Sequence, residues 1–183
     1  PRRGGYVLDF WGLGYEVAEK MGLVNELRRH DLDVEQFRIV DAQGRHITGI
    51  NQGALKDLTG GHIMSLQRSA VASALYEAVK DRVALRFGDS VTGLQESPRG
   101  VDVQFRDGEP ATFDLVVGAD GLHSAVRGLA FGEDGGFERF LGYYVAAFTA
   151  KGYPHRDPHA YVTYGEPGRQ IWRITMDEDT TVF

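Results

Sequence analysis

The stretch from Asp114 to Arg127 holds the residues whose types and spacing best suit ligand chemistry in this chain. It reads Asp-Leu-Val-Val-Gly-Ala-Asp-Gly-Leu-His-Ser-Ala-Val-Arg, in which an apolar strand leads to a glycine turn around Asp120 and to a helix start near Ser124. Glycine lets the backbone turn tightly and approach a bulky ligand, and free N–H groups at a helix N-terminus favour phosphate. The pattern therefore predicts a nucleotide site without identifying the cofactor.

A simpler interpretation of the same residues stays open. An aspartate at the end of a strand readily hydrogen-bonds its own backbone, so Asp120 could be a turn residue only. The glycines on either side of it, Gly118 and Gly121, favour the ligand interpretation. Ser124 is predicted to cap the following helix rather than to act as a nucleophile.

Arg68 is a second candidate for phosphate binding. It stands at the predicted corner between a short strand, residues 62–66, and a helix, residues 69–80. A guanidinium at that corner can reach a diphosphate that also meets the helix N-terminus. Most arginines in such places are simply exposed, so the residue alone does not decide between the two interpretations.

A third feature imitates a nucleotide site. Gly12 and Gly14 follow an apolar run and precede a helix, as in a dinucleotide-binding fingerprint, but Val17 stands where the third glycine belongs. No acidic residue ends a strand at the expected distance either. We interpret these glycines as a bend at the entry to the helix.

The histidines and cysteines limit the chemistry further. The chain has six histidines and no cysteine, which excludes disulfides, thiolate metal sites and a cysteine nucleophile. His155 and His159 share a proline-containing loop, so their spacing does not place them on one helical face. We predict no metal site.

The composition favours a small-molecule partner. With 183 residues, 42% of them hydrophobic, and a formal net charge of −6, the chain can form a globular core but offers no broad basic surface for nucleic acid or an anionic membrane. No apolar run approaches the ~20 residues of a membrane-spanning helix, and no secretory signal pattern is present, so we expect a cytoplasmic location. Aromatic residues in the last strands usually pack a core, and we assign no pocket to them.

The elements that position these residues mix helices with strands. One amphipathic helix is predicted over residues 14–30 and a β-hairpin over residues 34–50, followed by a less regular stretch to residue 61. Further strands are predicted at residues 83–87, 90–95, 101–105, 112–117, 141–149, 160–164 and 170–176. This succession predicts a mixed α/β fold in two layers or subdomains, with an antiparallel sheet in its last part.

Three segments together resemble the FAD-dependent aromatic hydroxylases, the single-component flavoprotein monooxygenases with the para-hydroxybenzoate-hydroxylase-like fold. They are the segment Gly4–Trp11, the arginine-plus-helix segment Leu66–Leu75, and the aspartate-glycine signature, in which Asp, Gly, Ser and Arg keep the family spacing. Ser69 and Ala70 depart from the Gly-Asp that often follows the arginine. Family members also carry a Gly-x-Gly-x-x-Gly loop, a ribose-binding acidic residue and a Gly-Asp motif that are absent here, so the chain resembles an internal fragment.

For the fold, the resemblance implies two partial domains. One is an FAD-binding domain with a mixed or parallel sheet, formed by residues 1–33 and 62–132. The other is part of an antiparallel-sheet substrate domain, formed by residues 34–61 and 133–183.

For the site, the resemblance implies that Arg68, Asp120 and Gly121 bind FAD and that Asp9 contacts it near the flavin ring. It also places Arg2 near the nicotinamide or flavin phosphates. Two simpler roles stay open, with Asp9 capping the next helix and Arg2 a solvated terminal charge. No catalytic side chain is implied, because the flavin carries the oxygen chemistry.

For function, the resemblance implies that NADPH or NADH reduces FAD, that O₂ is captured as a C4a-hydroperoxide, and that one oxygen passes to an aromatic or polyketide-like substrate. The expected partners are this substrate and O₂, with no nucleic acid and no membrane, and with a homodimer as an open question. Two alternatives remain: a flavin-dependent reductase or halogenase of the same fold, and a non-catalytic fragment unable to retain FAD.

Overall fold

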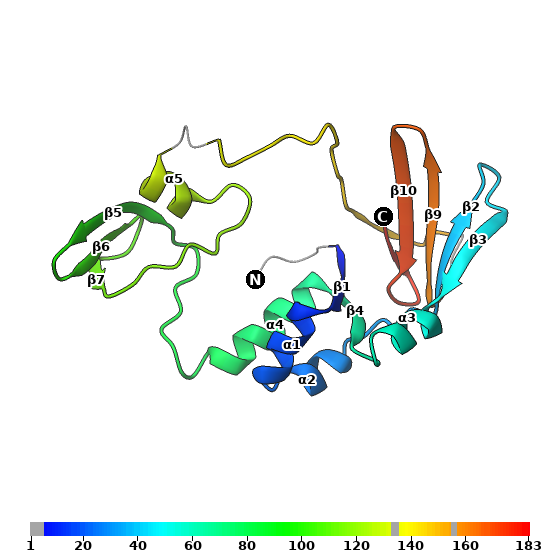
Figure 1. The fold of residues 1–183 in the computed structure, drawn as a ribbon, viewed down its shortest axis with the longest axis horizontal. Helices are drawn as coiled ribbons and strands as arrows, with labels where there is room; N and C mark the ends of the chain where they lie inside the picture. The colour runs from blue at the N-terminus through cyan, green and yellow to red at the C-terminus, as the bar shows by residue number, and fades with distance from the viewer. Residues whose placement is uncertain (1–5, 133–135, 155–156) are drawn as a thin grey trace. The chain divides into compact units, whose positions relative to one another are not determined.

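A computed structural model describes residues 6–132, 136–154 and 157–183 of the chain (Figure 1). Arg2 lies outside the described residues. The chain forms two compact units, one from Pro1–Val83 with Val145–Phe183 and the other from Ala84–Tyr144.

The first unit contains a two-stranded ribbon backed by helices. Strand β1 (Val7–Trp11) pairs antiparallel with β4 (Ile63–Gln67), and helix α4 (Arg68–Val79) follows β4 without a break. This confirms the predicted strand-to-helix corner at Arg68. The ribbon and its helices share an apolar core made of Tyr15, Ala18, Leu23, Leu27, Met64, Leu66 and Ala74.

The single helix predicted over residues 14–30 is wrong. The structure has two shorter helices, α1 (Leu13–Lys20) and α2 (Val24–Arg28). Between them Gly22 adopts a φ of +72°, a left-handed conformation that ends a helix and that glycine adopts without steric cost. Both helices bury side chains in the same core, Tyr15 and Ala18 from α1 and Leu27 from α2.

The predicted bend before the first helix is confirmed. Gly12 is the N-cap residue of α1 and has a φ of +58°, a left-handed value that bends the chain at the entry to the helix.

The first unit also contains a six-stranded sheet in the order β3-β2-β9-β10-β11-β8. Its strands are β2 (Gln36–Val40), β3 (His46–Asn51), β8 (Thr149–Lys151), β9 (Ala160–Glu166), β10 (Arg169–Thr175) and β11 (Thr180–Val182). Only the pair β2–β9 is parallel, so the sheet is mixed and its last four strands are antiparallel. The stretch after β3, expected to be irregular, instead forms helix α3 (Gln52–Leu58), capped by the Asn51 side chain.

One face of this sheet is buried. Tyr161 and Ile174 lie opposite each other on β9 and β10 and pack with Val7, Val34 and Val182. Since Val7 belongs to β1, this second core joins the six-stranded sheet to the two-stranded ribbon within one unit.

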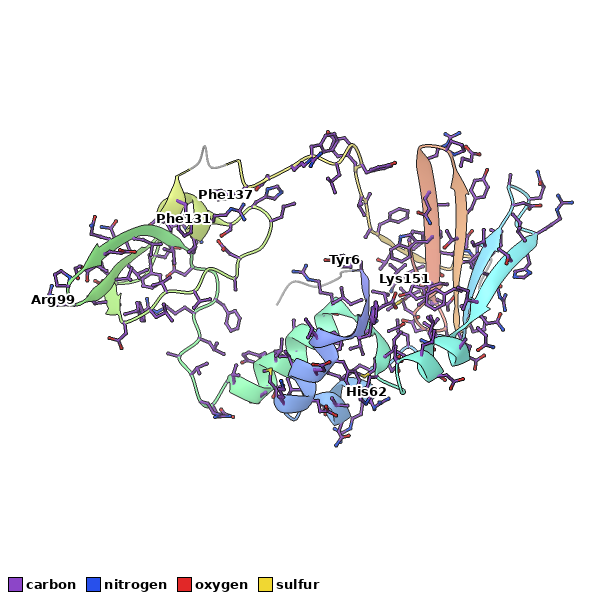
Figure 2. All side chains as sticks on the ribbon, viewed as in Figure 1. Tyr6, His62, Arg99, Phe131, Phe137 and Lys151 are labelled. Atoms are coloured by element: carbon purple, nitrogen blue, oxygen red, sulfur yellow. The ribbon has the colours of Figure 1, made fainter. Side chains whose placement is uncertain are left out.

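The second unit is a three-stranded antiparallel sheet and one helix. Its strands are β5 (Val91–Ser97), β6 (Gly100–Phe105) and β7 (Ala111–Phe113), and its helix is α5 (Ala125–Phe131). Figure 2 shows Arg99 at the tip of the β5–β6 hairpin.

Three of the predicted strands, at residues 83–87, 112–117 and 141–149, are wrong in whole or in part. The strand expected over residues 112–117 ends at Phe113, and both Leu115 and Val117 are 75% exposed. Residues 83–87 and 141–148 form no strand in the described chain, and β8 begins only at Thr149. A strand needs a neighbour to accept and donate its backbone hydrogen bonds, and apolar composition alone does not supply one.

The mixed α/β fold with mixed and antiparallel sheets is confirmed. The predicted division into a cofactor domain and a substrate domain stays a prediction. Among the described residues, none of the helices combines the length and apolar character that a membrane span requires.

Candidate functional site

Asp9 is held by two hydroxyl groups from distant parts of the chain. It lies directly opposite Ser65 in the β1–β4 pair, and the Ser65 hydroxyl donates to Asp9 Oδ1 over 2.8 Å. The Tyr161 phenol on β9 donates to the same oxygen over 3.2 Å. Ser65 is fully buried and Tyr161 is 8% exposed, whereas the Asp9 side chain reaches solvent.

The second carboxylate oxygen of Asp9 has no donor among the described residues. Asp9 also caps no described helix, because α1 begins after Gly12. The alternative in which Asp9 is a helix cap is therefore wrong. A carboxylate with one oxygen fixed and the other free is ready to accept a hydrogen bond from a ligand.

Arg68 is the first residue of α4, and its guanidinium forms no ion pair with any described residue. Its backbone N–H donates to the Tyr6 carbonyl over 3.2 Å, and its guanidinium lies 5.8 Å from the centre of the Tyr6 ring. Helix α4 has no side-chain cap and no acidic residue in its first turn. A cation beside an uncapped helix N-terminus suits an anionic ligand such as a diphosphate.

Asp120 is occupied with the start of helix α5. The Ser124 hydroxyl donates to its Oδ1, and the Val126 backbone N–H donates to its Oδ2 over 3.1 Å. These two hydrogen bonds hold the pKa of Asp120 below its ordinary value. Ser124 caps the helix as predicted, because its side chain accepts from the Arg127 backbone N–H over 3.0 Å.

The turn beside Asp120 needs its glycines. Gly121 has a φ of +92°, which L side chains rarely adopt, and a Cβ at Gly118 would lie 2.9 Å from the Val126 side chain. A hollow of about 750 Å³ adjoins this turn and is lined in part by Gly118, Gly121 and Leu94. That volume falls within the ordinary range for small-ligand pockets.

Arg127, which accompanies Asp120 in the signature, is engaged within the protein. Its guanidinium donates to the Leu122 carbonyl over 2.6 Å and lies 3.3 Å from Glu138 Oε1. It also lies 5.4 Å from the centre of the Phe137 ring. These contacts stabilise the turn and the helix and leave less of the guanidinium for a ligand.

The structure thus groups the predicted site residues in two sets. Asp9 and Arg68 lie in the first unit, on β1 and at the start of α4. Asp120 and Gly121 lie in the second unit, before α5. That these residues bind one cofactor stays a prediction.

Sequence reasoning missed Ser65 and Tyr161 as partners of Asp9. Ser65 gave a weak signal, as the one hydroxyl in the buried run Ile63–Leu66. Tyr161 gave none, because it is one of several aromatic residues in its strand region and lies 152 positions from Asp9.

A second side-chain group was also missed. Ligand atoms of Asp33, Glu35 and His159 lie within 4.8 Å of one another, all three residues being exposed. The parallel pairing of β2 with β9 brings them together. The Lys56 Nζ lies 3.4 Å from Asp33 Oδ1, so this carboxylate has an ion-pair partner within the protein. His159 Nδ1 is 3.0 Å from the Asp33 backbone carbonyl oxygen.

Comparison with known proteins decides the family. The model of the FAD binding domain family matches residues 14–167. This chain belongs to that family. The match confirms the predicted resemblance to FAD-dependent monooxygenases and identifies FAD as the cofactor of the family.

This chain is similar to named relatives over nearly its whole length. It is 30% identical over 180 residues to a flavin-dependent monooxygenase from an unknown prokaryotic organism, covering 98% of this chain and 46% of that protein. The solved structure of the tetracycline destructase Tet(55) is 25% identical, with a TM-score of 0.80 over 99% of this chain and 45% of the other. Klebsiella pneumoniae HpxO complexed with FAD and uric acid shares the fold, with 20% identity and a TM-score of 0.71 over 99% of this chain and 47% of the other. The chain spans about half the length of the curated relatives it matches.

The chemistry of the described residues fits FAD. The free oxygen of Asp9 accepts a donor, the Arg68 guanidinium is available to phosphate, and the turn at Gly121 permits close approach of a bulky group. The described residues therefore include side chains whose chemistry suits a flavin nucleotide, and which part of the cofactor each would meet stays a prediction.

Proposed function

We propose that the protein carrying this FAD binding domain is an FAD-dependent, NAD(P)H-using monooxygenase that hydroxylates an aromatic or polyketide-like small molecule. Membership of the family and similarity to a flavin-dependent monooxygenase support the oxygenase activity. The observation that carries the proposal is the Arg68 guanidinium, which has no ion-pair partner among the described residues, at the uncapped N-terminus of α4. It supplies permanent positive charge where a diphosphate would meet helix N–H groups.

Each predicted site residue has a role in this proposal. Arg68 binds the diphosphate and Asp9 accepts a hydrogen bond near the flavin ring. Arg2, which is outside the described residues, keeps its predicted role beside the nicotinamide or flavin phosphates. Asp120 holds the start of α5 through Ser124 and Val126, and Gly121 lets the cofactor approach the backbone.

FAD supplies the redox and oxygen chemistry when it is bound. The protein orients the cofactor, places the substrate beside it and keeps water away from the reacting atoms. No described side chain is required as a nucleophile or as a general base.

The substrate class and reductant are the finer parts of the proposal. The solved structure of Tet(55) is named a tetracycline destructase, and HpxO was solved with uric acid. Both names support a ring-bearing small molecule as the substrate. The choice between NADPH and NADH, the homodimer, the cytoplasmic location and the absence of nucleic-acid and membrane partners stay predictions.

Flavin binding and turnover test the proposal. The intact protein should copurify with FAD or bind added FAD, seen as the visible absorption of the bound flavin, and should oxidise NADPH or NADH with consumption of O₂. Hydroxylated product in a panel of phenolic and polyketide substrates would establish the monooxygenase. Reduction of FAD with no oxygenated product would instead favour a reductase or halogenase, and a colourless protein would refute flavin binding.

A further inference from the structure

One hydrogen bond joins the strand that carries Asp9 to the six-stranded sheet. The donor is the Tyr161 phenol on β9 and the acceptor is Asp9 Oδ1 on β1. We infer that Tyr161 is a positioning residue of the flavin site, which orients the Asp9 carboxylate so that its second oxygen accepts a hydrogen bond from FAD. The inference rests on the proposed function, since it requires that Asp9 contacts FAD.

The geometry at Asp9 explains how the phenol acts. Oδ1 receives both available donors, the Ser65 hydroxyl at 2.8 Å and the Tyr161 phenol at 3.2 Å. Two donors converging on one oxygen from different strands restrict rotation of the carboxylate. Oδ2 has no donor among the described residues and belongs to an exposed side chain, so it is left facing a ligand or solvent.

Tyr161 is itself held rigidly. Its ring stacks on Phe37 of the neighbouring parallel strand, with centroids 5.0 Å apart, and meets Trp172 edge-on at 6.0 Å. Only 8% of the residue is exposed. A donor fixed by packing on both sides transmits its position to the carboxylate that it contacts.

The protonation state of Tyr161 suits a permanent donor. Burial, and then the charge of Asp9, raise the pKa of the phenol far above its ordinary value. The phenol therefore keeps its proton at neutral pH and can donate a hydrogen bond to Asp9. Burial of a hydroxyl is costly unless it is hydrogen-bonded, and Asp9 supplies that partner.

The charge of Asp9 limits which part of FAD it can meet. An ionised carboxylate only accepts hydrogen bonds and repels phosphate. Its partner must therefore be a hydrogen-bond donor of FAD. Near the flavin ring, where the resemblance puts Asp9, those donors are an N–H of the ring and the hydroxyls of the ribityl chain, and the diphosphate is left to Arg68.

A matched pair of tyrosine variants tests this role in the intact protein. Tyr161→Phe removes the donor and keeps the ring, whereas Tyr164→Phe removes a phenol from the same strand whose partner is Glu166. We expect Tyr161→Phe to weaken FAD binding about threefold to tenfold, the size of one hydrogen bond. It should also shift the visible absorption bands of bound FAD, and Tyr164→Phe should leave both the Kd and the spectrum as in the wild type.

Removal of Asp9 separates positioning from a general structural effect. In an Asp9→Ala background, Tyr161→Phe should cause no further loss of FAD affinity, because the acceptor through which it acts is gone. Ser65→Ala removes the other donor to the same oxygen and should reproduce the spectral shift. Circular dichroism identifies any variant that does not fold, and the Ser65 variant then carries the test.

Three outcomes decide the matter. A Tyr161→Phe protein with wild-type affinity and spectrum overturns the inference, as does an equal loss of affinity with and without Asp9. A wild-type protein that does not bind FAD overturns the proposed function itself. If the wild type binds FAD and Tyr161→Phe binds it equally well, only the role of Tyr161 is overturned.

Discussion

The Ser124 hydroxyl donates to the Asp120 carboxylate four residues earlier in the chain, and the same hydroxyl accepts from the Arg127 backbone N–H. The side chains of Asp120 and Ser124, both part of the aspartate-glycine signature, therefore act together at the start of α5. The ordering of this turn depends on both side chains. Gly121, which lies between them in the chain, supplies the positive φ that lets the backbone turn from Asp120 to Ser124.

Loss of the Ser124 side chain should destabilise the second unit. Ser124→Ala removes the cap of α5 and is expected to lower the free energy of unfolding by about 1 kcal/mol, measured by urea titration. Asp120→Ala should lower it as well, because the Val126 N–H loses its acceptor. Asp114→Ala, an exposed carboxylate upstream, is the control and should leave stability unchanged.

The hydrogen bonds to Asp120 make the stability of the folded protein depend on pH in the acid range. The pKa of Asp120 is lowered in the folded protein, so its contribution to stability is present above the unfolded pKa of about 4 and is lost as the pH falls through the folded pKa. The wild type should therefore lose stability below about pH 4 more steeply than Asp120→Ala. Parallel acid-unfolding curves for the two proteins would contradict the assignment.

Arg68 should be required for FAD retention. Arg68→Ala in the intact protein is expected to weaken FAD binding by about 10-fold to 100-fold, since a charge-assisted contact to phosphate is lost. Arg99, another exposed arginine, stands in the turn between β5 and β6, and Arg99→Ala should bind FAD as the wild type does (Figure 2). Flavin affinity unchanged in Arg68→Ala would refute the phosphate role.

Tyr161 should make the protein sensitive to alkali. Its pKa is raised in the folded state, so its contribution to stability is present below the unfolded pKa of about 10 and is lost as the pH rises above it. Above about pH 10 the wild type should lose up to about 1.4 kcal/mol per pH unit more than Tyr161→Phe in urea unfolding. Tyr143→Phe, at a residue 72% exposed, should keep the wild-type slope.

Asp157 should hold the six-stranded sheet together on its other face. Its carboxylate bridges two arginines, with Oδ1 at 2.9 Å from Arg38 on β2 and Oδ2 at 2.6 Å from Arg173 on β10. Asp157→Ala leaves two partly buried cations without their partner and should cost about 1–3 kcal/mol in thermal or urea unfolding. Glu178→Ala, an exposed acidic residue near the C-terminal end of the chain, should cost nothing measurable.

The sequence by itself determined the features that depend on a few neighbouring residues. The corner at Arg68, the bend at Gly12 and the cap at Ser124 follow from local backbone chemistry, and all three are found as predicted. The resemblance to the flavoprotein monooxygenases also came from local motifs, and the family match confirms it. Such features are readable because their hydrogen bonds close within one turn or one strand end.

Only the tertiary structure decided which groups meet across long separations. The register of β1 with β4 places Asp9 opposite Ser65, and the packing of the six-stranded sheet brings Tyr161 to the same oxygen. The strand predicted beyond Phe113 was lost in the same way, because no described strand pairs with it, whereas the break at Gly22 is a local feature of the glycine backbone. Spacing along a chain describes its own helix or strand, whereas the partners of a buried or functional group are fixed by contacts that the chain forms only when it folds.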